Sequence, residues 1–275
     1  MRIVENSTHE GVQIFRFGSL PVGKPSFFSH VFYVDGLLID TGHSNMRKEV
    51  YEAVKDLPVQ QLLLTHHHED HTGNLPLLHK HFACPAYASA SCIDLMKRPP
   101  AISLAQRISW GSRPSYTDFT LHPEKIHTPN YHFEVIPIPG HAPDMVALYE
   151  PRKKWLFSAD LYVNHYIGYF LRNESVREQI VSIRRVLELD FEVLFCSHNP
   201  QLVGGKEKLV KKLAFLEDFY AKVAPLCVEG ATANQIFRQV GLKEKWSIRL
   251  LSQGHLSKLN MVKAVMRDEG MSRGT

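Results

Sequence analysis

Residues 61–74 read QLLLTHHHEDHTGN: an apolar run that ends in three consecutive histidines, followed by an acidic pair, a fourth histidine and a glycine. Imidazole and carboxylate groups are preferred ligands of zinc and related divalent ions. The stretch therefore indicates a metal site, and three arrangements compete to explain which of its side chains bind.

Two of these arrangements fit the sequence poorly. The zinc-protease helix requires His-Glu-x-x-His, whereas the glutamate here belongs to HEDH at residues 68–71, which is one residue too short. A histidine-rich surface tract seldom follows a buried apolar strand. The third arrangement takes His66 and His68 from the end of a strand, where alternate side chains point to the same side. Asp70 and His71 then lie in the tight turn beyond the strand.

The third arrangement, HxHxDH, resembles the signature of the metallo-β-lactamase fold superfamily. Members of this superfamily are mostly dinuclear metal hydrolases. The resemblance implies further acidic and histidine residues where strands end, and the chain supplies all of them in order: Asp40 in LLIDTG, His141 in IPIPGHAPD, Asp160 in LFSAD and His198 in VLFCSHNP.

The resemblance also implies how these residues would share two divalent metal ions. The implied ligands form two groups of three with one residue between them: His66, His68 and His141; Asp70, His71 and His198; and Asp160. Asp70 and Asp160 are the expected catalytic carboxylates, and Asp40 is expected to orient a ligand through a hydrogen bond. Zinc is the expected metal, with iron and manganese as alternatives, because availability often decides among them.

Several nearby residues are expected outside this ligand set. His67 and Glu69 should point away from the cluster, so we expect supporting roles for them at most. Cys196 is expected to be a packed core thiol. The segment LYVNHYIGYFLR, residues 161–172, is unusually aromatic for a loop and directly follows a predicted ligand. It indicates an apolar substrate pocket, although core packing is the alternative for each aromatic taken singly. The predicted lining residues are Tyr162, His165, Tyr166 and Tyr169.

The fold implied by the resemblance is α/β, a four-layer αββα metallo-β-lactamase sandwich over residues 1–203. Apolar, β-rich runs agree with it, and the Asp-Gly pair in HVFYVDGLLID predicts a hairpin. Ser44 or Asn45 is a candidate cap for a helix with an apolar stripe, and Asn173 for a helix over 174–188.

Residues 204–275 have a different character, with three predicted helices and almost no strand signal. The last predicted helix covers SIRLLSQGHLSKLNMVKAVMRDEG. Together with QIFRQVG, it is similar to the winged-helix-like tail of lactamase-beta-2-like and glyoxalase II-related metallo-hydrolases. We therefore expect a helical C-terminal domain or cap, winged-helix-like but without a clear wing. Packing beside the active site is favoured over nucleic-acid binding, because the basic residues of this part are as easily a solvated face.

Composition gives weaker indications. The 275 residues include 32 basic and 28 acidic ones, for a net charge of +4, and contain no block of like charges that would favour nucleic acid or a membrane. No signal-peptide core or membrane-spanning apolar stretch is apparent, so a cytoplasmic location is expected. The four cysteines form no closely spaced framework and are expected to be reduced. A homodimer is one alternative for the oligomeric state.

The leading functional hypothesis is a dinuclear hydrolase of a small ester, thioester or lactone. A hydroxide shared by the two ions would attack the carbonyl carbon. The alternatives are a phosphodiesterase or ribonuclease on the same two ions, and a non-hydrolytic iron oxygenase or ligand-binding regulator. The loops that frame the substrate differ from the family pattern at Ala142, Pro143 and Asp144, and at Ser197 and Asn199, which weakens any transfer of substrate specificity.

Overall fold

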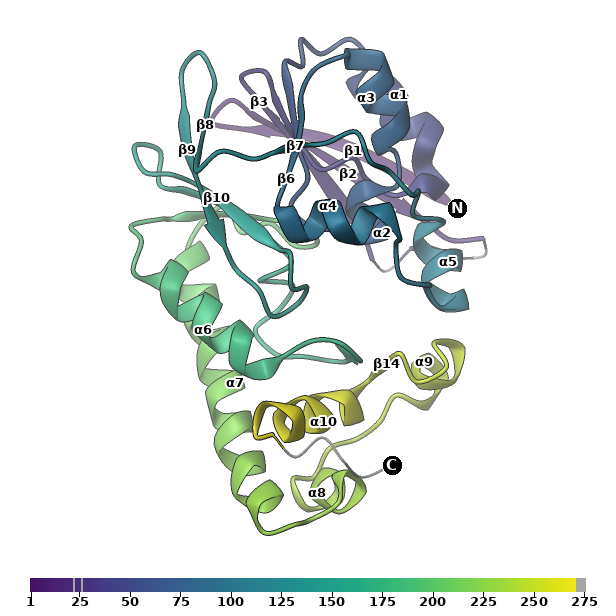
Figure 1. Ribbon diagram of the computed structural model, residues 1–275, viewed down its shortest axis with the longest axis vertical. Coiled ribbons are helices and arrows are strands. Elements are labelled where there is room, and N and C mark those ends of the chain that lie inside the picture. Colours follow the sequence, from purple (N-terminus) through teal and green to yellow (C-terminus); the bar gives the residue numbers. More distant parts are fainter. Residues whose placement is uncertain (22, 26, 271–275) are drawn as a thin grey trace.

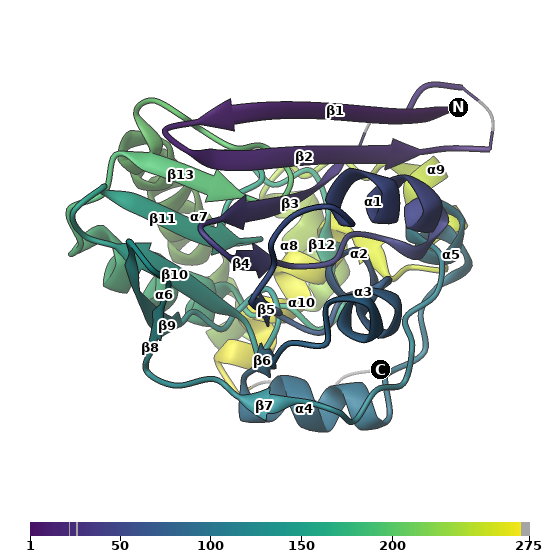
Figure 2. The same cartoon turned by 90° about the horizontal axis from the view of Figure 1, so that it is seen from above.

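The computed structural model describes residues 1–21, 23–25 and 27–270. Two large β-sheets lie face to face, and helices cover the outer side of each (Figure 2). This is the predicted αββα sandwich, and the fold class is confirmed. A third sheet of two strands connects the C-terminal helices to a loop beside the second large sheet.

The first sheet contains seven strands in chain order: β1 (Arg2–His9), β2 (Val12–Ser19), β3 (Ser29–Val34), β4 (Leu37–Ile39), β5 (Gln61–Leu63), β6 (Ala86–Ala88) and β7 (Thr120–Leu121). Strands β1 to β4 are antiparallel, and β4 to β7 are parallel. The predicted hairpin joins β3 to β4, with φ of 51° at Asp35 and 91° at Gly36, as a tight hairpin turn requires. Strand β1 is not among the predicted strands, because most of its side chains are exposed and show no apolar alternation.

The second sheet contains five strands: β8 (Lys125–His127), β9 (His132–Pro137), β10 (Val146–Glu150), β11 (Trp155–Ala159) and β13 (Val193–Cys196). Strands β11 and β13 are parallel, so their carboxyl ends meet at one edge. Aromatic side chains fill the space between the two sheets, with Phe32 of the first sheet in contact with Phe157 and Phe195 of the second. This apolar layer holds together the strand ends that carry the candidate site.

Helices beside the first sheet are η1 (Ser44–Met46), α1 (Arg47–Val54), α2 (Glu69–Thr72), α3 (Leu75–Phe82), α4 (Ala90–Lys97) and α5 (Leu104–Trp110). Of the predicted apolar stripe of the first helix, Met46, Val50 and Val54 are buried, whereas Leu57 lies beyond the helix and is half-buried. The predicted caps are wrong, because both side chains are used elsewhere. Ser44 Oγ accepts the Ser112 N–H at 2.7 Å, and the Asn45 amide donates to the carbonyl of Ile108 at 2.9 Å.

Helices α6 (Val176–Leu187) and α7 (Gly205–Val228) cover the second sheet (Figure 1). Ser175, not the predicted Asn173, caps α6, because its Oγ accepts the Glu178 N–H at 3.0 Å. The helix therefore begins slightly later than the predicted range.

The C-terminal part continues with α8 (Ala233–Gln239), α9 (Trp246–Leu251), β14 (Leu256–Ser257) and α10 (Lys258–Asp268). The single long helix predicted here is wrong: positive φ values at Gln253 and Gly254 end α9, and β14 then pairs with β12 (Phe170–Leu171). Residues of α7, α8 and α10 share one apolar core with α6 and the second sheet. Among the helices of the described ranges, none has the length and apolar character needed to cross a bilayer.

Candidate metal centre

The seven predicted ligands come together from both sheets at the carboxyl ends of their strands. They form two overlapping groups, whose candidate ligand atoms lie within 4.8 Å of one another in each: His66, His68, His141 and Asp160; and Asp70, His71, Asp160 and His198. The expected strand geometry is wrong in detail. Strand β5 ends at Leu63, so His66 and His68 lie in an irregular loop, and Asp70 and His71 belong to the short helix α2.

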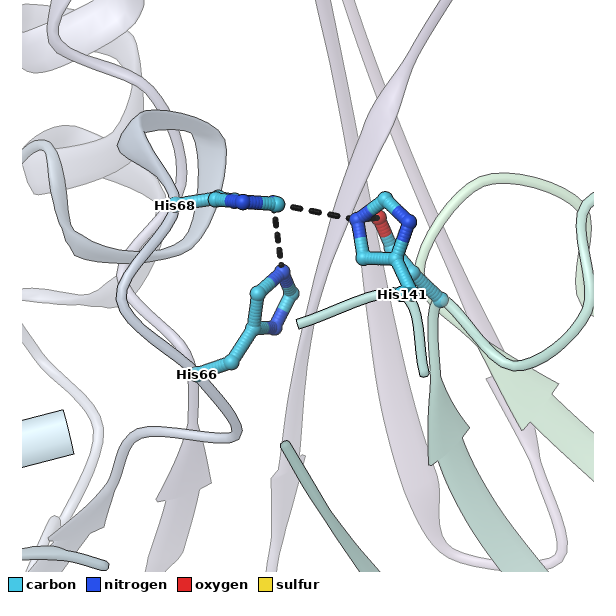
Figure 3. Close-up of side chains that lie close together, drawn as sticks. His66, His68 and His141 are labelled. Carbon is cyan, nitrogen blue, oxygen red and sulfur yellow. Dashed lines mark hydrogen bonds and ion pairs between the residues drawn. The ribbon is translucent and has the colours of Figure 1, made fainter. Parts of the chain in front are cut away.

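The first group is built around His68. Its Nδ1 atom lies 3.0 Å from Nε2 of His66 and 3.0 Å from Nε2 of His141 (Figure 3). The same Nε2 atom of His141 lies 3.2 Å from Oδ2 of Asp160. Three imidazoles and one carboxylate oxygen therefore face a common point.

The second group is built around the same aspartate. Oδ2 of Asp160 lies 3.1 Å from Nε2 of His198, and its Oδ1 lies 3.4 Å from Nε2 of His71. Oδ2 of Asp70 lies 3.4 Å from His198 Nε2 and 3.6 Å from His71 Nε2. Asp160 is the one residue that belongs to both groups.

The spacing of these atoms fits divalent metal ions. A tetrahedral ion with bonds of about 2.0–2.1 Å holds its ligand atoms about 3.4 Å apart. The closest pairs here are separated by 3.0–3.6 Å. In addition, His71 Nε2 and Asp160 Oδ1 are buried and have no hydrogen-bond partner among the residues that the structure describes, a state that costs free energy unless another group satisfies them. A bound cation would satisfy both atoms.

Four of the candidate histidines have their second ring nitrogen held by another group. The partners are Asp40 for His71 at 2.7 Å, Glu174 for His141 at 3.4 Å, the Phe28 carbonyl for His198 at 2.7 Å, and the Thr65 hydroxyl for His66 at 3.1 Å. Such outer partners fix the tautomer and ring orientation of a metal ligand. Asp40 contacts His71, in the orienting position that the sequence predicted for it. Its backbone has a φ of 63°, in the left-handed region that aspartate enters more readily than most residues.

Sequence reasoning missed Glu174. An acidic residue at the start of a predicted helix has an ordinary explanation as a helix N-terminal charge, so nothing in the pattern linked it to His141. Sequence reasoning also missed Trp110, whose ring centroid lies 5.9 Å from that of His198 and 5.0 Å from that of the buried His43. Trp110 falls in the segment 98–130, where no element could be predicted.

Burial and neighbouring charges set the protonation of the site. Burial favours the neutral form of His66 and His68, and the neighbouring histidines favour the ionised form of Asp160. Burial lowers the pKa of His66 and His68 well below the usual value, which keeps both rings neutral, the form that binds metals. Burial alone would raise the pKa of Asp160, but His198 and His71 hold it well below its usual range. Burial would likewise lower the pKa of His141, but Glu174 and Asp160 raise it to about 10.

The four predicted pocket residues differ in how far they are exposed to solvent. Tyr162 is 2% exposed and packs in the core, the alternative given for single aromatics. His165 and Tyr166 are exposed, and Tyr169 is half-buried. The Tyr169 ring packs edge-on against Phe27 at 5.8 Å, with the Lys245 ammonium 5.3 Å from its centroid. Their role in binding a substrate stays a prediction.

The molecule is thus an αββα sandwich with a two-part cluster of histidines and aspartates at the carboxyl ends of its strands. Residues 27–198 match the family model described as "Metallo-beta-lactamase superfamily", and the chain belongs to that superfamily. A metallo-beta-lactamase family protein from Thermus thermophilus has a similar structure, with a TM-score of 0.68 and 16% identity over 97% of each chain.

Several curated relatives of the chain are hydroxyacylglutathione hydrolases. A hydroxyacylglutathione hydrolase from Nitrosomonas eutropha is 28% identical over 52% of this chain and 49% of its own length. The hydroxyacylglutathione hydrolase GloC from Haemophilus influenzae is 29% identical over 56% of this chain and 74% of its own length. The chain thus spans about half the length of the Nitrosomonas relative. These similarities support the predicted class, a metal-dependent hydrolase.

Proposed function

We propose that this protein is a dinuclear metal-dependent hydrolase that cleaves a small ester, thioester or lactone, with a thioester as the first choice. The observation that carries the proposal is the position of Asp160, whose carboxylate takes part in both ligand groups. The choice of thioester comes from the relatives, since a hydroxyacylglutathione is an acyl thioester.

The residues would divide between two ions according to their grouping. His66, His68 and His141 would hold one ion, Asp70, His71 and His198 the other, and Asp160 would contact both. When bound, two such ions would lower the pKa of a water molecule and polarise the carbonyl group of the substrate. Zinc is our first choice, because imidazole and carboxylate ligands in tetrahedral sets suit it, and iron and manganese remain alternatives.

The chain's own residues would supply the proton handling. Oδ2 of Asp70 is directed toward His71 and His198, so we assign its other oxygen, Oδ1, to accept the proton of the attacking water. Burial raises the pKa of Tyr169 to about 12, so its hydroxyl stays protonated at neutral pH and is a candidate donor to the developing negative charge. Small molecules are the proposed partners, since the basic residues are not gathered into one block of sequence.

A substrate panel tests the proposal. Protein loaded with zinc, iron or manganese is assayed against thioesters of glutathione and of other thiols, simple esters, lactones, a β-lactam and bis-(p-nitrophenyl) phosphate. We expect thioester hydrolysis that disappears after treatment with a chelator and returns when metal is added.

Two results would change the proposal. Metal-loaded protein that cleaves only the phosphate diester would favour the phosphodiesterase alternative. Protein that carries its metal and hydrolyses no member of the panel would contradict a hydrolytic role.

A further inference from the structure

The middle histidine of the HHH stretch is tied to two side chains outside its own loop. The backbone N–H of His67 donates to Asp144 Oδ2 at 2.8 Å, and its ring Nδ1 lies 2.8 Å from Asp144 Oδ1. Its carbonyl oxygen accepts a hydrogen bond from Nη1 of Arg113 at 3.1 Å. His67 is not a member of either ligand group, as expected, yet both of its backbone polar groups and one ring nitrogen are held in place.

Asp144 belongs to a different ligand loop. It follows His141 by three residues and precedes β10 of the second sheet, and its side chain is fully buried. Its own carbonyl oxygen accepts a hydrogen bond from Ser89 Oγ at 2.9 Å, just before α4. Asp144 therefore connects the loop that carries His66 and His68, from the first sheet, to the loop that carries His141, from the second.

These contacts act where the first ligand group is assembled. His67 lies between two members of that group in sequence, and Asp144 is close to the third, His141. Because Asp144 holds both the backbone N–H and the ring of His67, it restrains the translation of the loop and the rotation of its peptide groups. A backbone link between the loops, from Val146 N to Thr65 O at 2.9 Å, lies on the strand side and does not hold the ring of His67.

We propose that Asp144 and His67 form an interloop clamp that positions His66, His68 and His141 for metal binding. The inference rests on the proposed function, since it needs a metal centre to position. Neither residue of the clamp belongs to the ligand set, so both are positioning residues. Outer partners that orient metal ligands are typically worth about 10–100-fold in metal affinity, and we expect a loss in that range when the clamp is removed.

Two substitutions at residue 144 distinguish positioning from a general effect on stability. Asp144→Ala removes both contacts. Asp144→Asn keeps an oxygen for the His67 N–H and places an amide N–H against Nδ1, which accepts it in the other neutral tautomer. We expect zinc affinity, measured by competition with a chromophoric chelator, to fall by about 10–100-fold for Asp144→Ala and to stay within about threefold of the wild type for Asp144→Asn.

Asp35→Ala is the matched control. Asp35 also ties two loops together, accepting hydrogen bonds from the Thr128 hydroxyl at 2.7 Å and the Asn130 N–H at 2.6 Å, but it lies at the end of β4 opposite Asp40. We expect it to lower the unfolding temperature of the metal-free protein without changing zinc affinity. If Asp144→Ala does not fold, His67→Phe takes its place, because it keeps an aromatic ring and the backbone contact to Asp144 and removes the Nδ1 contact.

Each outcome bears on the clamp. Folded Asp144→Ala or His67→Phe protein with wild-type zinc affinity would overturn it, as would a loss no larger than that of Asp35→Ala. A loss in Asp144→Asn as large as in Asp144→Ala would also overturn it, because the charge of residue 144, and not the clamp geometry, would then control affinity. A wild-type protein that binds no metal would overturn the proposed function and the clamp together, and that result is visible before any variant is made.

Discussion

At the scale of single residues, each candidate ligand histidine has one ring nitrogen that faces the metal cluster and one that faces away from it. The contacts of the nitrogen that faces away are as informative about the site as those of the other. Glu174 lies against Nδ1 of His141 and also accepts the N–H of Leu171 at 3.0 Å and the amide of Gln179 at 2.7 Å. Its carboxylate is thus fixed before any metal binds. Such preorganisation orients the imidazole toward the cluster.

Replacing Glu174 by Gln should therefore weaken metal binding. The variant keeps an oxygen for the Leu171 N–H but loses the negative charge that supports His141, and we expect zinc affinity to fall by roughly tenfold. Chelator competition measures the change. Glu178→Gln, at the exposed start of α6, is the control, and equal affinities for the two variants would contradict the assignment.

His30 makes a prediction about acid stability. It is 5% exposed, its Nδ1 lies 2.8 Å from the Ser197 carbonyl, and burial lowers its pKa from 6.5 to about 4. Between these values the unfolded chain binds a proton that the folded chain does not, so stability is lost as pH falls from 6.5 to about 4, by about 3 kcal/mol. Urea unfolding of metal-free protein should show this loss, and His30→Gln should lack it. Parallel pH profiles for the two proteins would refute the prediction.

At the scale of elements, the start of α6 is a place where the structure differs from the sequence-based prediction, and the two can be tested against each other. Ser175 caps the helix and also donates to Asp268 Oδ1 of α10 at 2.9 Å, whereas the predicted cap Asn173 is exposed and outside the helix. We expect Ser175→Ala to lower the unfolding free energy by about 1–2 kcal/mol and Asn173→Ala to leave it nearly unchanged. Chemical denaturation measures both, and the reverse order would show that the predicted cap is correct.

The elements that were predicted well share one property: their apolar pattern reflects local burial. The hairpin strands β3 and β4, whose side chains are all buried, and the stripe of α1, with Val50 and Val54 buried, are of this kind. The errors arise where contacts with distant segments of the chain determine the local structure. Ser44 is occupied by the segment after α5. The predicted C-terminal helix is interrupted because β14 pairs with β12, which lies far earlier in the chain.

The candidate site was more predictable than its surroundings. All seven candidate ligands could be named from the sequence, because the HxHxDH spacing and the strand-end positions of His141, Asp160 and His198 are visible in it. The residues that hydrogen-bond to the candidate ligands or to their loops were harder to predict from the sequence. Glu174 and Asp144 act on residues of other loops, and a single sequence contains no record of which loops meet.

At the scale of the whole molecule, the C-terminal helices share a core with the sandwich. Val262 and Val265 of α10 belong to the same buried cluster as Ile180 and Ile183 of α6, and Arg267 donates to the Glu174 carbonyl at 2.8 Å. We therefore expect residues 204–275 to form a cap that unfolds together with the sandwich. Calorimetry of the metal-free protein should show one transition, with equal calorimetric and van't Hoff enthalpies. Two separate transitions would instead support an independent C-terminal domain.

If two ions share the cluster around Asp160, as proposed, a titration with metal counts them. Chelator-treated protein is titrated with zinc while bound metal and thioester hydrolysis are followed together. We expect binding to saturate at two ions per chain and hydrolysis to reach its maximum only at that point, and we expect His141→Ala and His198→Ala each to remove one ion. Saturation at a single ion, or full hydrolysis by the metal-free protein, would contradict the proposal.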